Sequence, residues 1–350
     1  MLMMTFLEAL LLWTLKQLKS ERTVYAVFHL FKGKKSSQTI QDAYLYQVES
    51  VFYTLPNLTR SSFDENIQSL ISQSFLQMKE GPNYHITESG EYRLHDYFTK
   101  KSFPAFLNGM KYQEHAFVFW DRLGILIQAL SNLVNNNRQY YPISRNSKIL
   151  YWVKQFMMSQ KMSKHQLAAA LYDELYSIFL DDPPERPEII VFRLTGYKQI
   201  GKTVEQSAGK LSLETTEYWY RFLNLLHYVL DEVLEKRYKY PLLFSIIQDV
   251  YQPFPMTKST METYQLLLNN YTIADISKMR NLKENTIQDH IIEIALNNPN
   301  FCIQPFIDSN TEEKILQIAK EIGKQKLKPI KEKLENVSYF QIRLALAKNR

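Results

Sequence analysis

The sequence has little cysteine, glycine or proline, and each shortage excludes a class of protein. Its single cysteine, Cys302, excludes a disulfide framework and a zinc site built on cysteines, and it fits a reducing cytoplasm. Its 9 glycines in 350 residues are fewer than α/β folds with glycine-rich phosphate loops normally use. Because 23 Tyr and 20 Phe accompany this shortage, we predict a mostly α-helical protein with aromatic-rich cores.

Long hydrophobic runs are also missing. Residues 1–15 are apolar, but this stretch is shorter than the roughly 20 residues that span a bilayer, contains Glu8 and lacks a basic leader. We expect a first amphipathic helix there, and a cytoplasmic, nucleoid-associated protein with no membrane partner. With 45% apolar and 22% charged residues the composition excludes wholesale disorder, and the length predicts two or three domains.

The basic excess is concentrated near the carboxyl-terminal end. The net charge is +6, yet residues 314–350 alone hold ten Lys and Arg against three Glu, so the remaining chain is net −1. A localised patch of this kind suits phosphate backbones or an acidic partner, although a solvated lysine-rich helical face is the alternative interpretation. Lys324, Lys326 and Lys328 surround a glycine and a proline, where a loop between helices would display them.

Two proline-bearing segments, 181–187 and 252–257, are predicted domain boundaries, because proline removes a backbone donor and disfavours helix in the residue before it. They divide the chain into an amino-terminal helical domain (1–180), a middle helix-turn-helix module (188–251) and a carboxyl-terminal helix-turn-helix domain with a basic tail (258–350). Most of the segments between them carry apolar residues three and four apart, which predicts helices.

A winged helix is predicted within the first domain. A helix over 63–78 is followed by a short strand and by Thr87-Glu-Ser-Gly90, so we expect a small β wing near 82–95. Thr87 is a candidate cap for a following helix or turn, and Gly90 is a candidate for the positive φ of a tight turn. An ordinary loop between helices is the alternative.

A lysine-rich turn lies further upstream. Lys32, Lys34 and Lys35 surround the helix-ending Gly33 and precede Ser36, a candidate cap for the next helix. This arrangement would place positive side chains beside free backbone N–H groups, which is a ready phosphate contact. A solvated turn is the alternative interpretation.

The most specific pattern is a helix-turn-helix over residues 272–294. Thr272 is predicted to cap its first helix, Asn281 to make the turn, and residues 264–268 to belong to a supporting helix. The predicted inward positions are Ile273, Ile276, Met279, Leu282, Ile287, Ile291 and Ile294. The stretch from Thr203 repeats this pattern in register, which strengthens the helical interpretation of both copies.

The second helix of this pattern is poor in the side chains that usually read DNA. Residues 259–298 hold three basic and five acidic side chains, a net charge of −2, whereas DNA-reading helices bring Arg or Lys to bases and phosphates. Docking of a protein is therefore an alternative to DNA contact. The candidate DNA contacts are Lys32, Lys34, Lys35, Lys278, Arg280, Lys283, Asn285, Gln288, Lys324, Lys326, Lys328 and Lys331.

Residues 196–203, Gly-Tyr-Lys-Gln-Ile-Gly-Lys-Thr, match the phosphate-loop pattern G-x-x-x-x-G-K-[ST], and residues 189–194 before them are a candidate strand. The bulky intervening residues, the lack of a later strand ending in an exposed Asp, and the role of Thr203 as a helix cap all argue against nucleotide binding. The seven histidines are scattered without metal-binding spacing. We therefore predict no catalytic residue, no metal site and no cofactor, and expect that the protein is not an enzyme.

Residues 259–348 resemble the helicase-associated helix-turn-helix domain found at the ends of some bacterial RecQ-type DNA helicases. The residues that carry this resemblance are Thr272–Ile294, Leu327–Leu334 and Val337–Leu344. Residues 32–42 and 119–123 are similar to YpbB-like proteins of Gram-positive bacteria, which carry the same terminal domain and lie beside the RecQ-type helicase RecS. One departure is Lys283 at the expected cap of the second helix, where Ser or Thr is commoner.

The resemblance implies an accessory subunit that supplies in trans the module that other RecQ-type helicases carry in cis. The helicase partner would hydrolyse ATP, and this protein would contact the helicase and DNA at a fork or a single-strand/duplex junction, in repair or replication-fork processing. The alternative is a sequence-specific transcription regulator that uses its helix-turn-helix modules.

Overall fold

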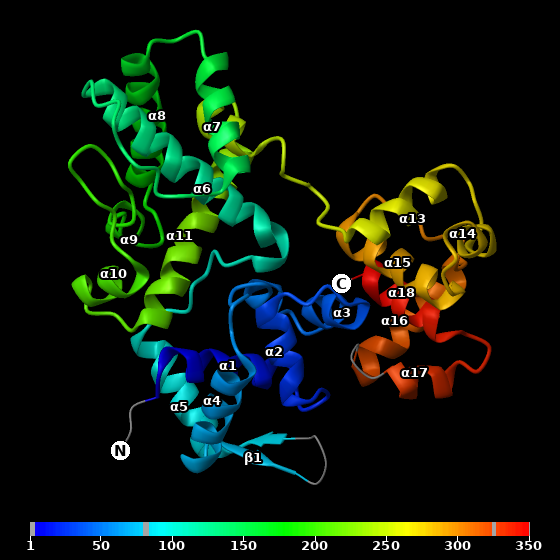
Figure 1. Ribbon diagram of the computed structural model, residues 1–350. Coiled ribbons are helices and arrows are strands. Elements are labelled where there is room, and N and C mark those ends of the chain that lie inside the picture. The colour runs from blue at the N-terminus through cyan, green and yellow to red at the C-terminus, as the bar shows by residue number, and fades with distance from the viewer. Residues whose placement is uncertain (1–3, 80–83, 324–326, 350) are drawn as a thin grey trace. The chain divides into compact units, whose positions relative to one another are not determined.

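A computed structural model describes residues 4–79, 84–323 and 327–349 (Figure 1). Within these residues the chain forms 18 α-helices, one short 3-10 helix and one two-stranded sheet. The prediction of a mostly α-helical protein with a small β element is confirmed.

The chain forms two compact units that interleave along the sequence. Unit 1 comprises 1–12, 65–75 and 87–252, and unit 2 comprises 13–64, 76–86 and 253–350. Helices α1 (Phe6–Gln17) and α4 (Arg60–Ser72) each run from one unit into the other. Of the two proline-bearing segments, 181–187 lies inside unit 1, and 252–257 spans a division between the units.

Each unit has its own set of helices. Those of unit 1 are α5 (Glu88–Lys100), α6 (Gly109–Val134), α7 (Ser147–Ser159), α8 (Lys164–Leu180), α9 (Glu188–Val191), α10 (Val204–Lys210), α11 (Thr215–Glu235) and α12 (Pro241–Ile247). The elements of unit 2 are α2 (Val24–Lys32), α3 (Ser37–Leu45), η1 (Glu49–Val51), β1 (Leu76–Met78), β2 (Tyr84–Ile86), α13 (Lys258–Leu268), α14 (Ile273–Arg280), α15 (Glu284–Asn297), α16 (Ser309–Ile322), α17 (Leu327–Lys333) and α18 (Tyr339–Lys348).

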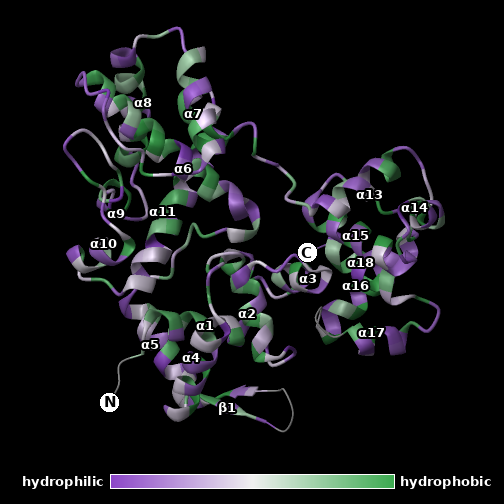
Figure 2. Ribbon diagram, viewed as in Figure 1, coloured by the Kyte–Doolittle hydropathy of each residue, from purple (hydrophilic) through white to green (hydrophobic). Residues whose placement is uncertain are grey.

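Unit 1 is built around α6 and α11, whose hydrophobic colouring is visible in Figure 2. Aromatic rings dominate this core: Phe222 of α11 packs edge-on against Trp120 of α6 with centroids 5.0 Å apart, and Phe6 lies 5.6 Å from Tyr220. In the described chain, α6 alone is long and apolar enough to cross a membrane by length and composition, but 56% of its most apolar window is buried within the protein. We interpret α6 as a core helix.

The small two-stranded sheet begins earlier in the chain than the predicted wing. The helix expected over 63–78 ends at Ser72, because Ser74 adopts a left-handed backbone (φ 59°) that α-helices exclude. β1 and β2 then pair antiparallel, with Leu76 opposite Ile86. The strands of the element expected near 82–95 therefore lie at 76–78 and 84–86.

Thr87 caps a helix and thereby ends the wing. Its Oγ1 accepts a hydrogen bond from the Gly90 N–H at 3.0 Å, as the N-cap of α5. The prediction of a positive φ at Gly90 is wrong, since this glycine lies in the first turn of α5.

The lysine-rich turn has the predicted caps. Gly33 ends α2 with a φ of 66°, and a Cβ there would lie 2.1 Å from the Tyr53 ring, so only glycine fits. Ser36 then caps α3 by accepting a hydrogen bond from the Thr39 N–H at 3.3 Å.

The repeated pattern is confirmed in local structure. Thr203 and Thr272 each form a capping box at the start of a short helix, α10 and α14. Ser212 and Asn281, nine residues after these threonines, both adopt a left-handed backbone (φ 55° and 51°) in the turn to the second helix.

His227 lies in a buried polar cluster of unit 1. Its side chain is 2% exposed, its Nδ1 accepts a hydrogen bond from the Asn108 N–H at 3.1 Å, and its ring centroid lies 4.8 Å from that of Tyr112. The Tyr112 hydroxyl and Lys111 both donate hydrogen bonds to Asp231. Burial, assisted by the charge of Lys111, lowers the pKa of His227 to about 3.

We predict that unit 1 loses stability as the pH falls below 6.5. Between the unfolded pKa of about 6.5 and the folded pKa of about 3, His227 binds a proton only in the unfolded chain, so the free energy of unfolding decreases by about 1.4 kcal/mol per pH unit. Urea unfolding between pH 7.5 and 5 measures this slope, and His227→Asn is expected to be less stable at pH 7.5 but to show a shallower decline. An equal slope in the variant would contradict the assignment.

Candidate nucleic-acid interface

The candidate interface is built on the helix-turn-helix of α14 and α15 in unit 2. The Thr272 Oγ1 accepts a hydrogen bond from the Asp275 N–H at 3.2 Å, and the Asp275 carboxylate accepts one from the Thr272 N–H at 3.1 Å. The left-handed backbone of Asn281 turns the chain, and Lys283 is the N-cap of α15, without a side-chain capping bond. The predicted caps and turn are therefore confirmed.

The predicted inward positions are confirmed on α15 and are partly wrong on α14. Ile276, Ile287, Ile291 and Ile294 are fully buried, but Met279 is 56% exposed. The reason is that Arg280 takes the inward position at the end of α14, so Met279 faces outward.

The Arg280 side chain of α14 is held against α13. Its guanidinium donates hydrogen bonds to the Ser259 carbonyl at 2.7 Å and to the Glu262 carboxylate at 2.7 Å, and its side chain is 12% exposed. Predicted as a DNA contact, this side chain instead ties α14 to α13.

Most of the acidic side chains that argued against DNA binding form ion pairs or hydrogen bonds within the protein. Glu262 pairs with Arg280, Asp275 completes the capping box of α14, and Asp289 pairs with Arg343. Buried Glu293 accepts hydrogen bonds from the Thr257 N–H (2.5 Å) and the Thr260 Oγ1 (2.6 Å). Glu284 is left as the one acidic side chain of 259–298 with no partner among the described residues.

Burial shifts the pKa of two groups that join α13 to α15. It raises the pKa of Glu293, opposed by the bonds from Thr260 and Thr257 and by the positive charge of Lys35. It also lowers the pKa of His290, whose Nδ1 lies 2.7 Å from the Thr263 Oγ1. These groups act as structural links rather than as candidate ligands.

The remaining polar candidates lie around the turn and the first turns of α15. Lys278, Lys283 and Asn285 are exposed, and Gln288 is half-buried. Two of these side chains carry positive charge, which suits phosphate oxygens, and two are amides of the type that hydrogen-bonds base edges. This cluster therefore combines positive charge suited to phosphates with amides suited to base edges.

The lysine-rich turn belongs to the same unit as this helix-turn-helix. Lys34 and Lys35 are exposed, whereas the Lys32 Nζ donates to the Leu58 carbonyl at 3.2 Å and lies 5.7 Å from the centroid of the Phe28 ring. Lys32 is thus partly engaged in holding the end of α2, and Lys34 is better placed for a ligand.

The carboxyl-terminal lysines divide into exposed and engaged groups. Lys328 is 81% exposed and 3.9 Å from Glu332, and Lys331 donates to the Glu335 carbonyl. Lys348, counted in the basic tail, donates to the Phe301 carbonyl at 2.9 Å. Lys324 and Lys326 lie outside the described residues.

The net charge belongs to unit 2. This unit holds 22 of the 42 Lys and Arg and 16 of the 36 Asp and Glu, whereas the remaining 20 and 20 in unit 1 cancel. Sequence reasoning placed the basic excess in residues 314–350, but residues 13–64 add a further net +3 to the same unit. A localised positive field of this kind favours a polyanion such as DNA.

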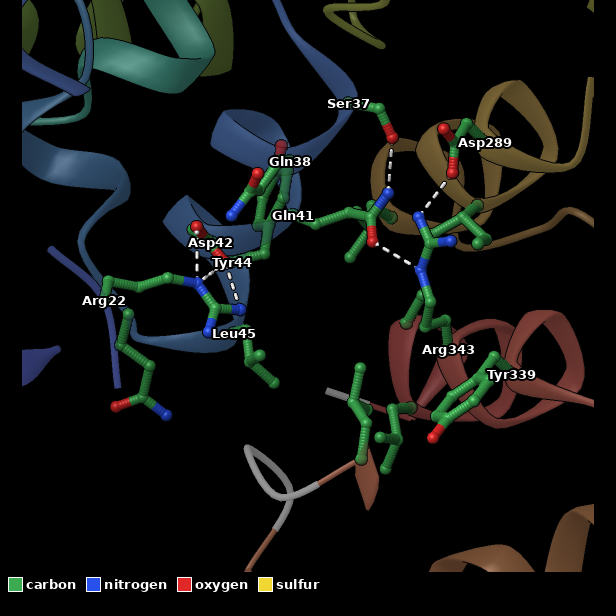
Figure 3. Close-up of a pocket in the computed structure, with 16 residues that line it drawn as sticks. Arg22, Ser37, Gln38, Gln41, Asp42, Tyr44, Leu45, Asp289, Tyr339 and Arg343 are labelled. Carbon is green, nitrogen blue, oxygen red and sulfur yellow. Dashed lines mark hydrogen bonds and ion pairs between the residues drawn. The ribbon is translucent and has the colours of Figure 1, made fainter. Parts of the chain in front are cut away.

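A cavity of about 480 Å³ lies between α3, α15 and α18 (Figure 3). Arg343 of α18 pairs with Asp289 of α15 and donates to the Gln41 Oε1 of α3 at 2.9 Å. The Tyr44 hydroxyl of α3 also donates to the Asn297 Oδ1 of α15, at 2.6 Å. No motif predicted that α3 would pack on the helix-turn-helix, since these partners are about 250 to 300 residues apart in the sequence.

The phosphate-loop pattern forms a closed turn. The residues expected as a strand before it are helical at α9, so that expectation is wrong. Six of the eight backbone amides of 196–203 donate inside the protein: Gly196 to Gln199 O, Tyr197 to Ser131 Oγ, Gln199 to Gly196 O, Gly201 to Thr195 Oγ1, Lys202 to Phe192 O and Thr203 to Gln206 Oε1. A phosphate cradle needs such amides free, so this geometry does not support nucleotide binding.

No cluster of three or more His, Cys, Asp or Glu within the part of the chain that the structure describes has the geometry to hold a metal ion.

Comparison with known proteins adds two findings. Residues 259–346 match the family described as a helix-turn-helix domain. Protein YpbB of Bacillus subtilis (strain 168) is 34% identical over 347 residues, which cover 99% of this chain and 98% of that protein. No solved structure matches significantly. The similarity therefore extends over both units, and the helix-turn-helix prediction for the carboxyl-terminal segment is confirmed.

We predict that Arg343→Gln destabilises unit 2 by about 1 kcal/mol, because it leaves Asp289 without a cation in a partly buried site. Urea unfolding of the full chain measures this change. In the double variant with Asp289→Asn, part of the loss is expected to return, since no unpaired carboxylate remains. Strict additivity of the two single changes would show that the pair is not coupled.

Proposed function

The chain belongs to the family of protein YpbB, and from this premise we propose that it binds DNA through unit 2 as a non-enzymatic accessory subunit of a RecQ-type (RecS-like) helicase. The observation that carries the DNA part is the helix-turn-helix of α14 and α15. Most of its acidic side chains are paired within the protein, and it belongs to unit 2, which holds the whole net charge of the chain. The role would lie in DNA repair or replication-fork processing in the cytoplasm.

The helicase part is supported by the resemblance of residues 259–348 to the module that some RecQ-type helicases carry at their own ends. A separate protein that carries this module would supply it in trans, and ATP hydrolysis would be left to the helicase. The closed turn of residues 196–203 is consistent with this division, because most of its amides are engaged within the protein.

The DNA contacts are proposed to be mainly to phosphates. The exposed cations of the interface are Lys34, Lys278, Lys283 and Lys328, whereas Asn285 and Gln288 are the base-reading types on α15. This composition favours recognition of DNA structure over recognition of one sequence.

We predict that Lys278→Glu/Lys283→Glu weakens binding of forked DNA and lowers the slope of log affinity against log salt by about 2, since each lost phosphate contact removes roughly one unit of slope. Fluorescence anisotropy between low and moderate salt measures this slope. The matched control is Lys198→Glu/Lys210→Glu, which changes the charge equally at exposed sites of unit 1. Equal losses in the two variants would contradict a specific role for the helix-turn-helix.

We predict that the protein, purified from its native bacterium after nuclease treatment, retains a near-stoichiometric RecQ-type helicase, identified by mass spectrometry. Loss of the helicase together with the nucleic acid would contradict a protein–protein complex. A strong preference of the purified protein for one duplex sequence would instead support a transcription regulator.

A further inference from the structure

We infer that the surface formed by α7 and the adjoining part of α6 in unit 1 is a docking site for an acidic, apolar segment of a partner protein. This inference goes beyond the proposed function: it concerns the electroneutral unit, and it does not depend on DNA binding by unit 2.

Exposed apolar side chains are concentrated in the segment that contains α7 and α8. Within the described chain 18 large apolar side chains are exposed, and eight of them lie between residues 141 and 180. Tyr141 is 95% exposed, Met158 68% and Tyr151 66%. On α8, Tyr172 and Tyr176 stack ring on ring at 5.5 Å in the open. Soluble proteins rarely leave such a concentration uncovered unless it meets a partner.

The chain that forms α7 and its flanking loops has only positive charge over a long stretch. Residues 122–172 contain seven Lys and Arg and no Asp or Glu. Arg122 is buried against Asp249, but Arg138, Arg145, Lys148, Lys154 and Lys161 are exposed. Within the described chain, none of these five cations has a carboxylate within ion-pair distance. Along α7 an incoming carboxylate would therefore meet unpaired cations, and the first carboxylate that follows in the sequence is the exposed Asp173 of α8.

A groove of about 300 Å³ opens within this cationic surface. Its walls are Ile125 and Ala129 of α6, Leu150, Val153, Met157 and Met158 of α7, and Tyr140 and Pro142 of the preceding loop. Lys154 and Lys164 stand at its edge, and the Lys164 Nζ donates to the Met157 carbonyl at 2.7 Å. This volume is at the lower end of ligand pockets, and methionine side chains adapt to differently shaped apolar groups.

The groove selects a protein over a nucleic acid. Apart from Tyr140, its walls are aliphatic and thioether side chains, which receive apolar side chains and offer no ring on which a base would stack. A segment in which apolar side chains are flanked by Asp or Glu would pack its apolar side chains in the groove and pair its carboxylates with the cations. The occupant is therefore a partner segment with leucine-like or aromatic residues next to carboxylates.

The test is selection of a phage-displayed library of random 12-residue peptides on the full-length protein. We expect enriched peptides to combine large apolar residues with Asp or Glu, and to bind in fluorescence anisotropy when made synthetically. Enrichment of basic peptides, no enrichment, or tighter binding of a 20-nucleotide oligothymidine to this face would overturn the inference.

Two variants locate the binding site. Lys148→Glu/Lys154→Glu/Lys161→Glu reverses the exposed cations, and Met158→Asp places a carboxylate at the groove. Each is expected to weaken the selected peptide about tenfold or more, since like charges at a rim repel the ligand. The matched control, Lys198→Glu/Lys210→Glu/Arg237→Glu, changes three exposed cations of unit 1 that do not line the groove, and it is expected to bind as the wild type does. Undiminished binding by the first two variants would overturn the inference, whereas forked-DNA binding is expected to stay unchanged in both.

Discussion

In unit 2 one cation, Arg343, links helices from distant parts of the sequence. Its guanidinium joins three helices that lie far apart in the sequence, because it pairs with Asp289 of α15 and donates to Gln41 of α3 from its own place on α18. Tyr44 adds a second bond from α3, to Asn297 of α15. The helix-turn-helix is therefore supported from outside its own sequence, and its position relative to the lysine-rich turn follows from this support.

Internal pairing decides which charges the helix-turn-helix presents. Glu293 of α15 is buried against the start of α13, Glu262 is paired with Arg280, and Asp289 is paired with Arg343. A module whose sequence is net negative thus turns Lys278 and Lys283 toward solvent with few competing carboxylates. The two units differ accordingly, since one carries the positive field suited to a polyanion and the other combines balanced charge with an exposed apolar face.

Local features were predictable from the sequence, and long-range ones were not. The caps at Thr272 and Ser36 and the turn at Asn281 follow from side chains that act within three or four residues. Met279 and Arg280 exchanged their expected roles, because an arginine that finds three acceptors on α13 can occupy an inward position. The packing of α3 on α15 could not be predicted from periodicity or motifs, because it depends on individual hydrogen bonds between residues that only the folded unit brings together.

The interleaving of the units has a consequence for synthesis on the ribosome. The helix α3 emerges about 240 residues before α15 and about 290 residues before α18, which cover it in the folded protein. At a usual elongation rate this interval lasts roughly 10–60 s, a time during which α3 lacks its partners α15 and α18. Unit 1 closes first, although its chain passes through unit 2 twice before it does so. The order of synthesis therefore makes the helix-turn-helix the final part to assemble. A chain interrupted after residue 252 would carry a complete unit 1 and an incomplete unit 2 in which α3 is not covered.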